Sequence, residues 1–144
     1  MQRTEQGQAS YAHVHEIING LTNKGWHVRL YEPQSTAQGF LGRLANIIRV
    51  QFAAISSRVK PDMVYVRLHF STLPVIIWAK IRKIPIVIEV NGGYNDLYVA
   101  WPRAKSFRPF MDWLRRAQFQ LADGVIAVTD LLAQWVEEVA MRED

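Results

Sequence analysis

Residues 84–90 read IPIVIEV, and every residue of this stretch except Pro85 and Glu89 is β-branched and apolar. A nearly continuous apolar run of this length is typical of a strand that is buried on both faces of a parallel sheet. Asn91, Gly92 and Gly93 follow directly. Two adjacent glycines permit positive φ and a close backbone approach, so a tight loop is predicted at the carboxyl end of the strand.

Strands and helices alternate on both sides of this stretch. Downstream, a helix is predicted over 107–121, then a strand over 124–128 and a helix capped by Thr129. Upstream, a strand is predicted over 63–68, then a helix that Ser71 or Thr72 caps and that runs to about Lys83. Nearer the start, the pattern predicts a helix that ends at Gly25, a strand over 26–31 and a helix with an apolar face over 41–55. This alternation predicts an α/β fold, a Rossmann-like doubly wound parallel sheet, in a single domain over 1–144.

The start of the chain departs from this pattern. Folds of this class open with a central strand ahead of the first helix, but the residues before Gly7 read MQRTEQ and cannot line a buried strand. Losing about five inward side chains at roughly 2 kcal/mol each removes on the order of 10 kcal/mol. We therefore expect a truncated chain without its first strand, with a partner or an irregular segment in the gap as the alternative.

Bulk composition fits a folded protein with an ordinary core. The 144 residues are 49% apolar and 21% charged, carry a formal charge of +4 and include no cysteine. The positive charge favours anionic partners, although a plain solvated basic surface explains it equally well. The longest apolar stretch has seven residues and the first residues are polar, so neither a membrane span nor a signal peptide is predicted. A cytoplasmic location is expected, with peripheral contact at the inner face of the membrane as an extension of it.

Four segments, in order, resemble the glycosyltransferases of family 4, which have the GT-B fold. The resemblance covers most of the chain. It rests on Gly7 and the helix that leads to KGWHV at 24–28, on PDMVYVR at 61–67, on IPIVIEVNG at 84–92 and on ADGVIAVT at 122–129.

The resemblance implies a function as well as a fold. In this family two Rossmann-like domains face each other, and the N-terminal one binds the sugar acceptor. The C-terminal one binds the nucleotide sugar through an E-x7-E signature, which is absent from these 144 residues. The chain is then the acceptor-side half of a retaining, metal-independent enzyme that is inactive alone and uses no cofactor besides the nucleotide-sugar co-substrate of the whole enzyme. A cell-envelope glycan or a lipid-linked sugar is the expected acceptor.

Two alternatives stay open at this point. The chain could be a non-enzymatic acceptor-binding or membrane-associated subunit that pairs with a separate donor-binding chain. It could also be a stand-alone module for a small phosphorylated ligand.

Candidate acceptor-binding residues lie where the strands end, because ligands of open α/β sheets bind there. Gly7 opens a helix N-terminus that suits an anion, unless it is a simple cap. Arg67 offers a planar fork for phosphate or carboxylate, and His69 follows it; a surface charge and a structural histidine are the plainer interpretations. The loop after the 84–90 strand adds groups that hydrogen-bond sugar hydroxyls: Asn91, Gly92, Gly93, Tyr94, Asn95 and Asp96. Many family members have a histidine where Asn91 stands, so no histidine-assisted step carries over, and a plain turn remains the alternative.

Basic and aromatic residues interleave between 101 and 116. This pattern is typical of a segment that docks on an anionic membrane, but aromatics packed on the sheet beside solvated arginines would give it too. No nucleic-acid-binding motif supports a nucleic-acid partner. His13 and His15 point in different directions on a helix, so no metal site is expected. The membrane-facing candidates are Arg103, Lys105, Arg108, Arg115 and Arg116.

Overall fold

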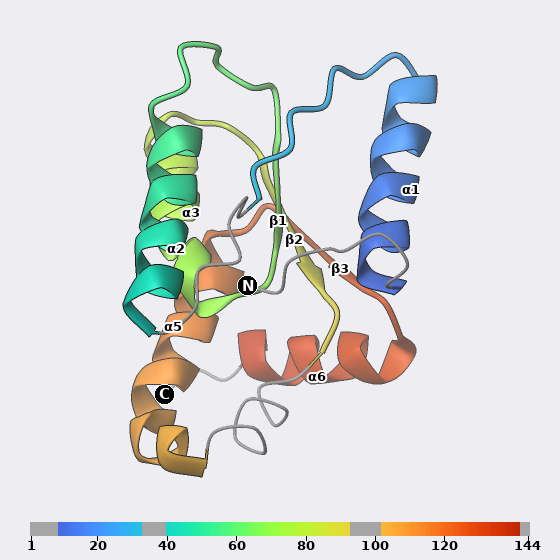
Figure 1. The fold of residues 1–144 in the computed structure, drawn as a ribbon. Coiled ribbons are helices and arrows are strands. Elements are labelled where there is room, and N and C mark those ends of the chain that lie inside the picture. The colour runs from blue at the N-terminus through green and yellow to red at the C-terminus, as the bar shows by residue number, and fades with distance from the viewer. Residues whose placement is uncertain (1–8, 33–39, 93–101, 142–144) are drawn as a thin grey trace. The chain divides into compact units, whose positions relative to one another are not determined.

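A parallel sheet of three strands organises the second half of the chain. The computed structural model describes residues 9–32, 40–92 and 102–141. The strands are β1 (Val64–Arg67), β2 (Ile86–Val90) and β3 (Gly124–Ala127), and they lie in that order with β2 in the middle (Figure 1). All three belong to one compact unit over 57–144, and a second compact unit covers 1–56.

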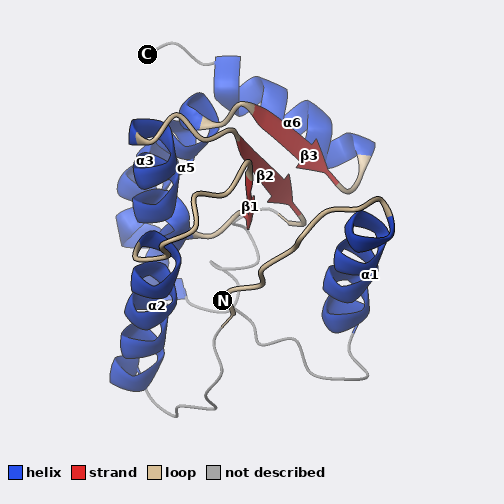
Figure 2. Ribbon diagram, turned by 90° about the horizontal axis from the view of Figure 1, so that it is seen from above, coloured by secondary structure: helices blue, strands red, loops and turns tan. Residues whose placement is uncertain are grey.

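Helices connect the strands, as parallel pairing requires. The short 3-10 turn η1 (Phe70–Thr72) and helix α3 (Leu73–Ile81) join β1 to β2. The turn η2 (Pro102–Phe107) and helix α5 (Arg108–Leu121) precede β3, and α6 (Asp130–Met141) follows it. Figure 2 shows these helices beside the sheet. The α/β class with a parallel sheet flanked by helices is thereby confirmed.

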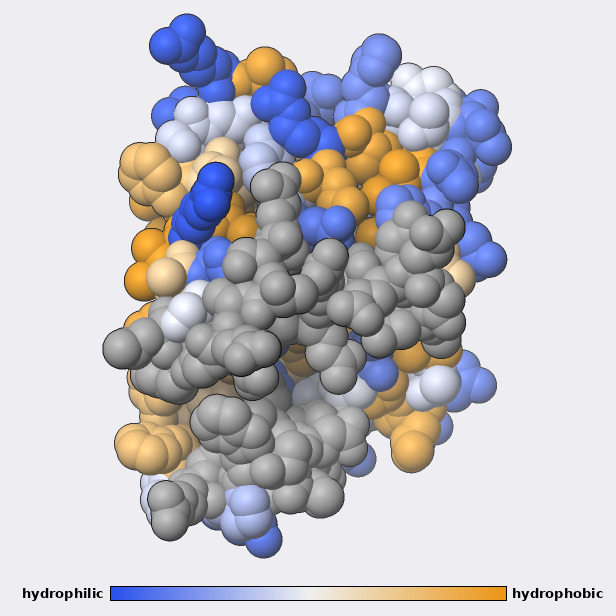
Figure 3. All heavy atoms as spheres, viewed as in Figure 1, coloured by the Kyte–Doolittle hydropathy of each residue, from blue (hydrophilic) through white to orange (hydrophobic). Residues whose placement is uncertain are grey.

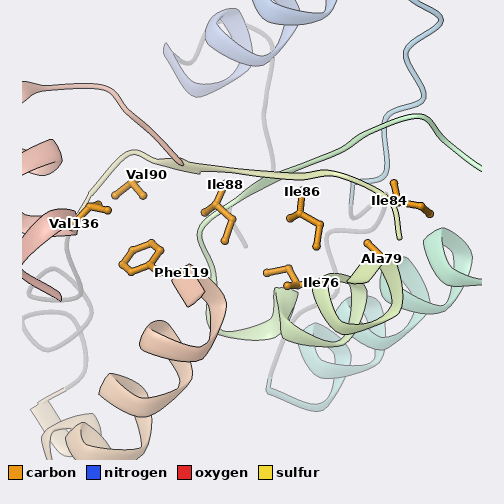
Figure 4. Packing of buried hydrophobic residues seen from close by; sticks show 8 residues of the cluster. All are labelled: Ile76, Ala79, Ile84, Ile86, Ile88, Val90, Phe119 and Val136. Atoms are coloured by element: carbon orange, nitrogen blue, oxygen red, sulfur yellow. The ribbon is translucent and has the colours of Figure 1, made fainter. Parts of the chain in front are cut away.

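The core of this unit lies between β2 and the three helices. Alternate β2 residues Ile86, Ile88 and Val90 point to one side, where they meet side chains of α3, α5 and α6 (Figure 4). All three are fully buried. The core also includes Ile76, Ala79, Ile84, Phe119 and Val136. The β-branched run thus forms the buried central strand that its composition predicts.

Asp123 ties the start of β3 to the start of β2. Its backbone N–H donates to the carbonyl oxygen of Ile86 at 2.9 Å, and its Oδ2 accepts from the Ile86 N–H at 2.9 Å. Its other oxygen accepts from Lys80 Nζ at 2.9 Å, a bond that lowers the pKa of this carboxyl. The aspartate of the ADGVIAVT segment therefore has a structural role in the sheet.

The unit over 1–56 contains helices α1 (Ala9–Asn23) and α2 (Phe40–Ile55). Gly25 follows α1 with φ of 87°, in the left-handed region that glycine adopts without strain. The Trp26 N–H reaches back to the Leu21 carbonyl at 3.1 Å, which satisfies an acceptor at the helix end. The predicted helix stop at Gly25 is confirmed.

The strand predicted over 26–31 is wrong. These residues form no described strand, and Trp26 and Leu30 are 47% and 43% exposed. A strand needs a neighbour for its N–H and C=O groups, and no described strand pairs with this segment. Alternation of apolar residues alone therefore did not produce a strand here.

The apolar stripe of α2 is also more exposed than its pattern suggests. Leu44, Ile48 and Phe52 are 41%, 59% and 71% exposed. Hydrophobic residues are visible among hydrophilic ones on the face drawn in Figure 3. The predicted helix is present, but these three side chains of its apolar face are not buried.

Candidate functional site

The site begins where β1 and β2 end side by side. In the parallel ladder Arg67, the last residue of β1, is the partner of Glu89, next to the last residue of β2. Asn91 and Gly92 follow β2 immediately and are exposed. The sheet thus brings Arg67 and the Asn91–Gly92 turn to the same edge, the edge at which open α/β sheets bind ligands. Gly7 and the loop residues Gly93, Tyr94, Asn95 and Asp96 lie outside the described residues.

A buried carboxylate lies at the centre of this edge. Glu89 is only 2% exposed although it sits in an apolar strand. Its Oε1 accepts from Arg67 Nε at 3.3 Å and from Arg67 Nη2 at 3.2 Å. Its Oε2 accepts from the Tyr65 hydroxyl at 2.5 Å. A buried charge is tolerated when it is paired and hydrogen-bonded in this way.

Tyr65 is a permanent donor in this arrangement. Burial, and then the hydrogen bond to Glu89, raises the pKa of the Tyr65 phenol far above its ordinary value. The phenol therefore stays protonated and keeps donating to the carboxylate at any physiological pH. The sequence analysis did not identify the role of Glu89. The available signal was a single acidic residue inside a β-branched run, in a strand that pairs with the strand ending at Arg67.

The Arg67 guanidinium group contacts Glu89 on one edge and is partly exposed to solvent. Its Nε and Nη2 face the carboxylate, and its side chain is 35% exposed. A guanidinium group has five N–H donors in a planar fork. The edge formed by Nη1 and the second hydrogen of Nη2 is not used by Glu89. Arg67 therefore keeps donors with the geometry that suits phosphate or carboxylate.

His69 shapes the turn between β1 and α3. Its Nδ1 accepts from the Ser71 backbone N–H at 3.3 Å and lies 2.7 Å from the Ser71 hydroxyl. An acceptor at Nδ1 leaves the proton of the neutral ring on Nε2. Burial lowers the pKa of His69 to about 4, so the ring is neutral near pH 7. The cap predicted at Ser71 or Thr72 is therefore different in detail: His69 accepts the capping bond of η1, and the Thr72 side chain makes no capping bond to α3.

Helix α5 fixes the backbone at the same turn. Gln118 is fully buried, and its Nε2 donates to the carbonyl oxygen of His69 at 2.9 Å. This contact joins α5 to the end of β1. The candidate site at the strand ends thus stands on a rigid support of sheet and helix.

The basic aromatic segment falls mainly on α5 and η2. Phe107, Phe110 and Trp113 are 65%, 57% and 58% exposed, and Phe110 stacks with Trp113 at 5.8 Å between ring centroids. Lys105 and Arg108 are exposed as well. These three aromatic side chains therefore do not pack on the sheet. In the part of the chain that the structure describes, no helix has the length and apolar character to cross a bilayer.

The remaining basic candidates are placed differently. The Arg115 side chain is 13% exposed, donates to Asp112 at 2.8 Å and lies over the Trp135 ring at 4.8 Å. Arg116 is half-buried, and the side chain of Arg103 is not described.

Among the described residues, no group of three or more metal-ligating side chains is found.

Comparison with known proteins supplies the family. Searches of curated proteins and of solved structures found no significant match. The model of Glycosyltransferase Family 4 matches residues 12–144, which include most of the first unit, the whole of the second and the entire sheet. Since the match spans most of the 144 residues, the chain belongs to Glycosyltransferase Family 4.

Proposed function

We propose that this chain forms the acceptor-binding side of a retaining glycosyltransferase that takes its sugar from a nucleotide-sugar donor. The observation that carries the proposal is the meeting of Arg67 and the Asn91–Gly92 turn at the carboxyl edge of β1 and β2. Family membership supports a glycosyl transfer as the reaction class, and the carboxyl edge of an α/β sheet is where such folds bind their ligands. A cell-envelope glycan or a lipid-linked sugar is the acceptor class that we assign.

The edge offers the groups that an acceptor needs. The Asn91 amide both donates and accepts, so it can hydrogen-bond sugar hydroxyls, and a neutral His69 carries its proton on Nε2. Arg67 adds a cationic fork for an anionic group. The proposed site also includes Gly92, Gly93, Tyr94, Asn95 and Asp96. Because the Asn91 carboxamide is neither an acid nor a base near neutral pH, Asn91 binds and orients the acceptor without acting as a general acid or base.

Donor binding requires residues that these 144 do not contain. In a retaining transfer without metal, the positive charge that develops at the sugar carbon is stabilised by the leaving diphosphate. The E-x7-E signature that would hold the donor does not occur in this sequence. We therefore place the donor site on other residues, in the same protein or in a partner chain.

The 144 residues by themselves should show no sugar transfer. The expected result is product formation at the level of the protein-free control when uridine-, guanosine- and adenosine-diphosphate sugars are incubated with lipid-linked and soluble sugar acceptors. Product release measured by mass spectrometry checks this. Turnover above the control with any donor would contradict the proposal that the donor site lies on residues outside these 144.

We also propose that η2 and the start of α5 contact an anionic membrane. The exposed Phe107, Phe110 and Trp113 provide apolar area, and the exposed Lys105 and Arg108 provide charge. A segment with both features binds at the headgroup boundary of a bilayer. Arg115 and Arg116 contribute less to this surface, since the Arg115 side chain is 13% exposed and paired with Asp112, and Arg116 is half-buried.

Neutralising Lys105 and Arg108 together, as Lys105→Gln and Arg108→Gln, should weaken binding to anionic vesicles. Each basic residue near such a surface contributes about 1 kcal/mol, so the double variant should lose up to roughly 30-fold in partition coefficient at low salt. Cosedimentation with vesicles of phosphatidylserine and phosphatidylcholine measures this. Arg82→Gln, an exposed arginine stacked on Trp78, is the matched control and should bind like the unaltered chain. Equal binding to neutral and anionic vesicles would remove the electrostatic part of the proposal.

A further inference from the structure

We infer that Glu89 is a positioning residue: it holds Arg67 by one edge of the guanidinium group so that the other edge binds an oxyanion, a phosphate or a carboxylate, of the acceptor. The inference rests on the proposed function, because it assigns the substrate class of that same edge of the sheet. It adds a residue that touches no substrate itself and a chemical requirement on the acceptor.

Glu89 has the rigidity that positioning needs. Its side chain is 3% exposed and belongs to the central strand, whose neighbours Ile88 and Val90 are fully buried. The hydroxyl of Tyr65, on the adjacent strand β1, donates to one carboxylate oxygen of Glu89 at 2.5 Å. The other oxygen is therefore presented to Arg67 from a fixed place. A long, half-exposed arginine side chain loses much of its rotamer freedom through such a contact before any ligand arrives.

The donors of Arg67 can be assigned one by one. Glu89 Oε1 takes the Nε hydrogen and one Nη2 hydrogen, at 3.3 Å and 3.2 Å between heavy atoms. The second Nη2 hydrogen and both Nη1 hydrogens remain. The structure gives Nη1 no partner among the described residues. Two of these three hydrogens lie parallel on the outer edge of the fork, where they match the two oxygens of a phosphate or a carboxylate.

The charge of the pair decides what kind of ligand fits. Glu89 and Arg67 are formally neutral together, and the neighbouring His69 is uncharged because burial lowers its pKa to about 4. Paired hydrogen bonds from the outer edge of the Arg67 guanidinium group are then the feature that selects the ligand. We expect selection of phosphate and carboxylate over chloride, which has no pair of oxygens to bridge the fork. Lysine could not replace arginine here, because an ammonium group is a point charge that cannot serve two anions through a planar fork.

Nuclear magnetic resonance of the 144-residue chain tests the inference, with inorganic phosphate, acetate and the neutral methyl α-glucoside as probes. Phosphate and acetate should shift the Arg67 Nε–H and the Asn91 and Gly92 amides in a saturable way, while chloride at equal ionic strength should not. Arg67→Lys should weaken phosphate binding about tenfold or more, the loss of one bidentate charged contact. Glu89→Gln should weaken it about threefold to tenfold through lost orientation, although it removes a negative charge next to the anion.

Two further variants keep the outcome clear. Glu89→Asp retains the charge but withdraws the carboxylate from Arg67, so it should weaken phosphate binding in the same direction if Glu89→Gln fails to fold. Arg82→Lys is the matched control on an exposed arginine outside this edge and should leave the phosphate affinity unchanged. A merely structural glutamate would alter stability without altering the phosphate affinity of the folded variant.

The possible results separate this inference from the proposed function. If Arg67→Lys binds phosphate as the unaltered chain does, the oxyanion site is wrong. If Glu89→Gln and Glu89→Asp bind it equally well or better, the positioning role of Glu89 is wrong. If methyl α-glucoside shifts the Asn91 and Gly92 amides but phosphate and acetate leave Arg67 unchanged, the inference fails and the acceptor site stands. If none of the probes shifts this edge, both proposals fail there.

Discussion

Replacing Ile88 with alanine should lower the free energy of unfolding by about 3 kcal/mol, within the range of 2 to 5 kcal/mol for truncation of a buried isoleucine. Ile88 is fully buried in the middle of β2, among the side chains from α3 and α5 that Figure 4 shows. The loss combines the transfer of the removed carbons with a cavity that the helices cannot fill. Because whole-domain stability is typically about 5 to 15 kcal/mol, the change is large.

Urea unfolding followed by circular dichroism measures this loss. Ile126→Ala in the neighbouring strand is the matched control, because Ile126 is 49% exposed and should lose less than about 1 kcal/mol. If Ile88→Ala leaves too little folded protein, Ile88→Val should still cost about 0.5 to 1.5 kcal/mol. Equal losses at Ile88 and Ile126 would show that the core does not lie where the structure places it.

The central strand and the strand over 26–31 show what sequence patterning can predict. The run at 84–90 is nearly all apolar and β-branched, a composition typical of a central strand in a parallel sheet, and β2 does lie between β1 and β3. The alternating run of Trp26, Val28 and Leu30 needs a neighbouring strand, and no local pattern supplies one. Its exposed state in the structure follows from that missing pairing.

The candidate site was predicted in outline but not in its chemistry. Arg67 and Asn91 could be placed at one edge from the strand order alone, because the carboxyl ends of parallel strands meet there. The role of Glu89 depends on the register between β1 and β2, which pairs it with Arg67 across 22 residues of sequence. Arg115 shows the same limit, since only the packing of α5 against α6 sets its guanidinium over Trp135.

His69 should make the stability of the chain fall on mild acidification. Burial lowers its pKa to about 4 from the ordinary value of 6.5, so the folded state resists the proton that the unfolded state accepts. Between pH 6.5 and 4 the unfolded chain therefore binds more protons, and the free energy of unfolding decreases as pH falls. The decrease attributable to His69 reaches at most about 3 kcal/mol and levels off below pH 4, where both states are protonated.

His69→Asn isolates this contribution. Asparagine offers an oxygen that can accept from the Ser71 N–H in place of Nδ1, and it is a good capping residue, but it does not titrate. The difference in unfolding free energy between the two proteins, measured in urea from pH 7.5 to 3.5, should shift toward the variant as pH falls from 6.5 to 4. Contributions from the rest of the chain are common to both proteins and cancel in that difference. If the free energies of unfolding of the two proteins changed with pH in parallel, His69 would have the same pKa in the folded and unfolded chain. Burial would then not be what keeps its ring neutral in the turn after β1.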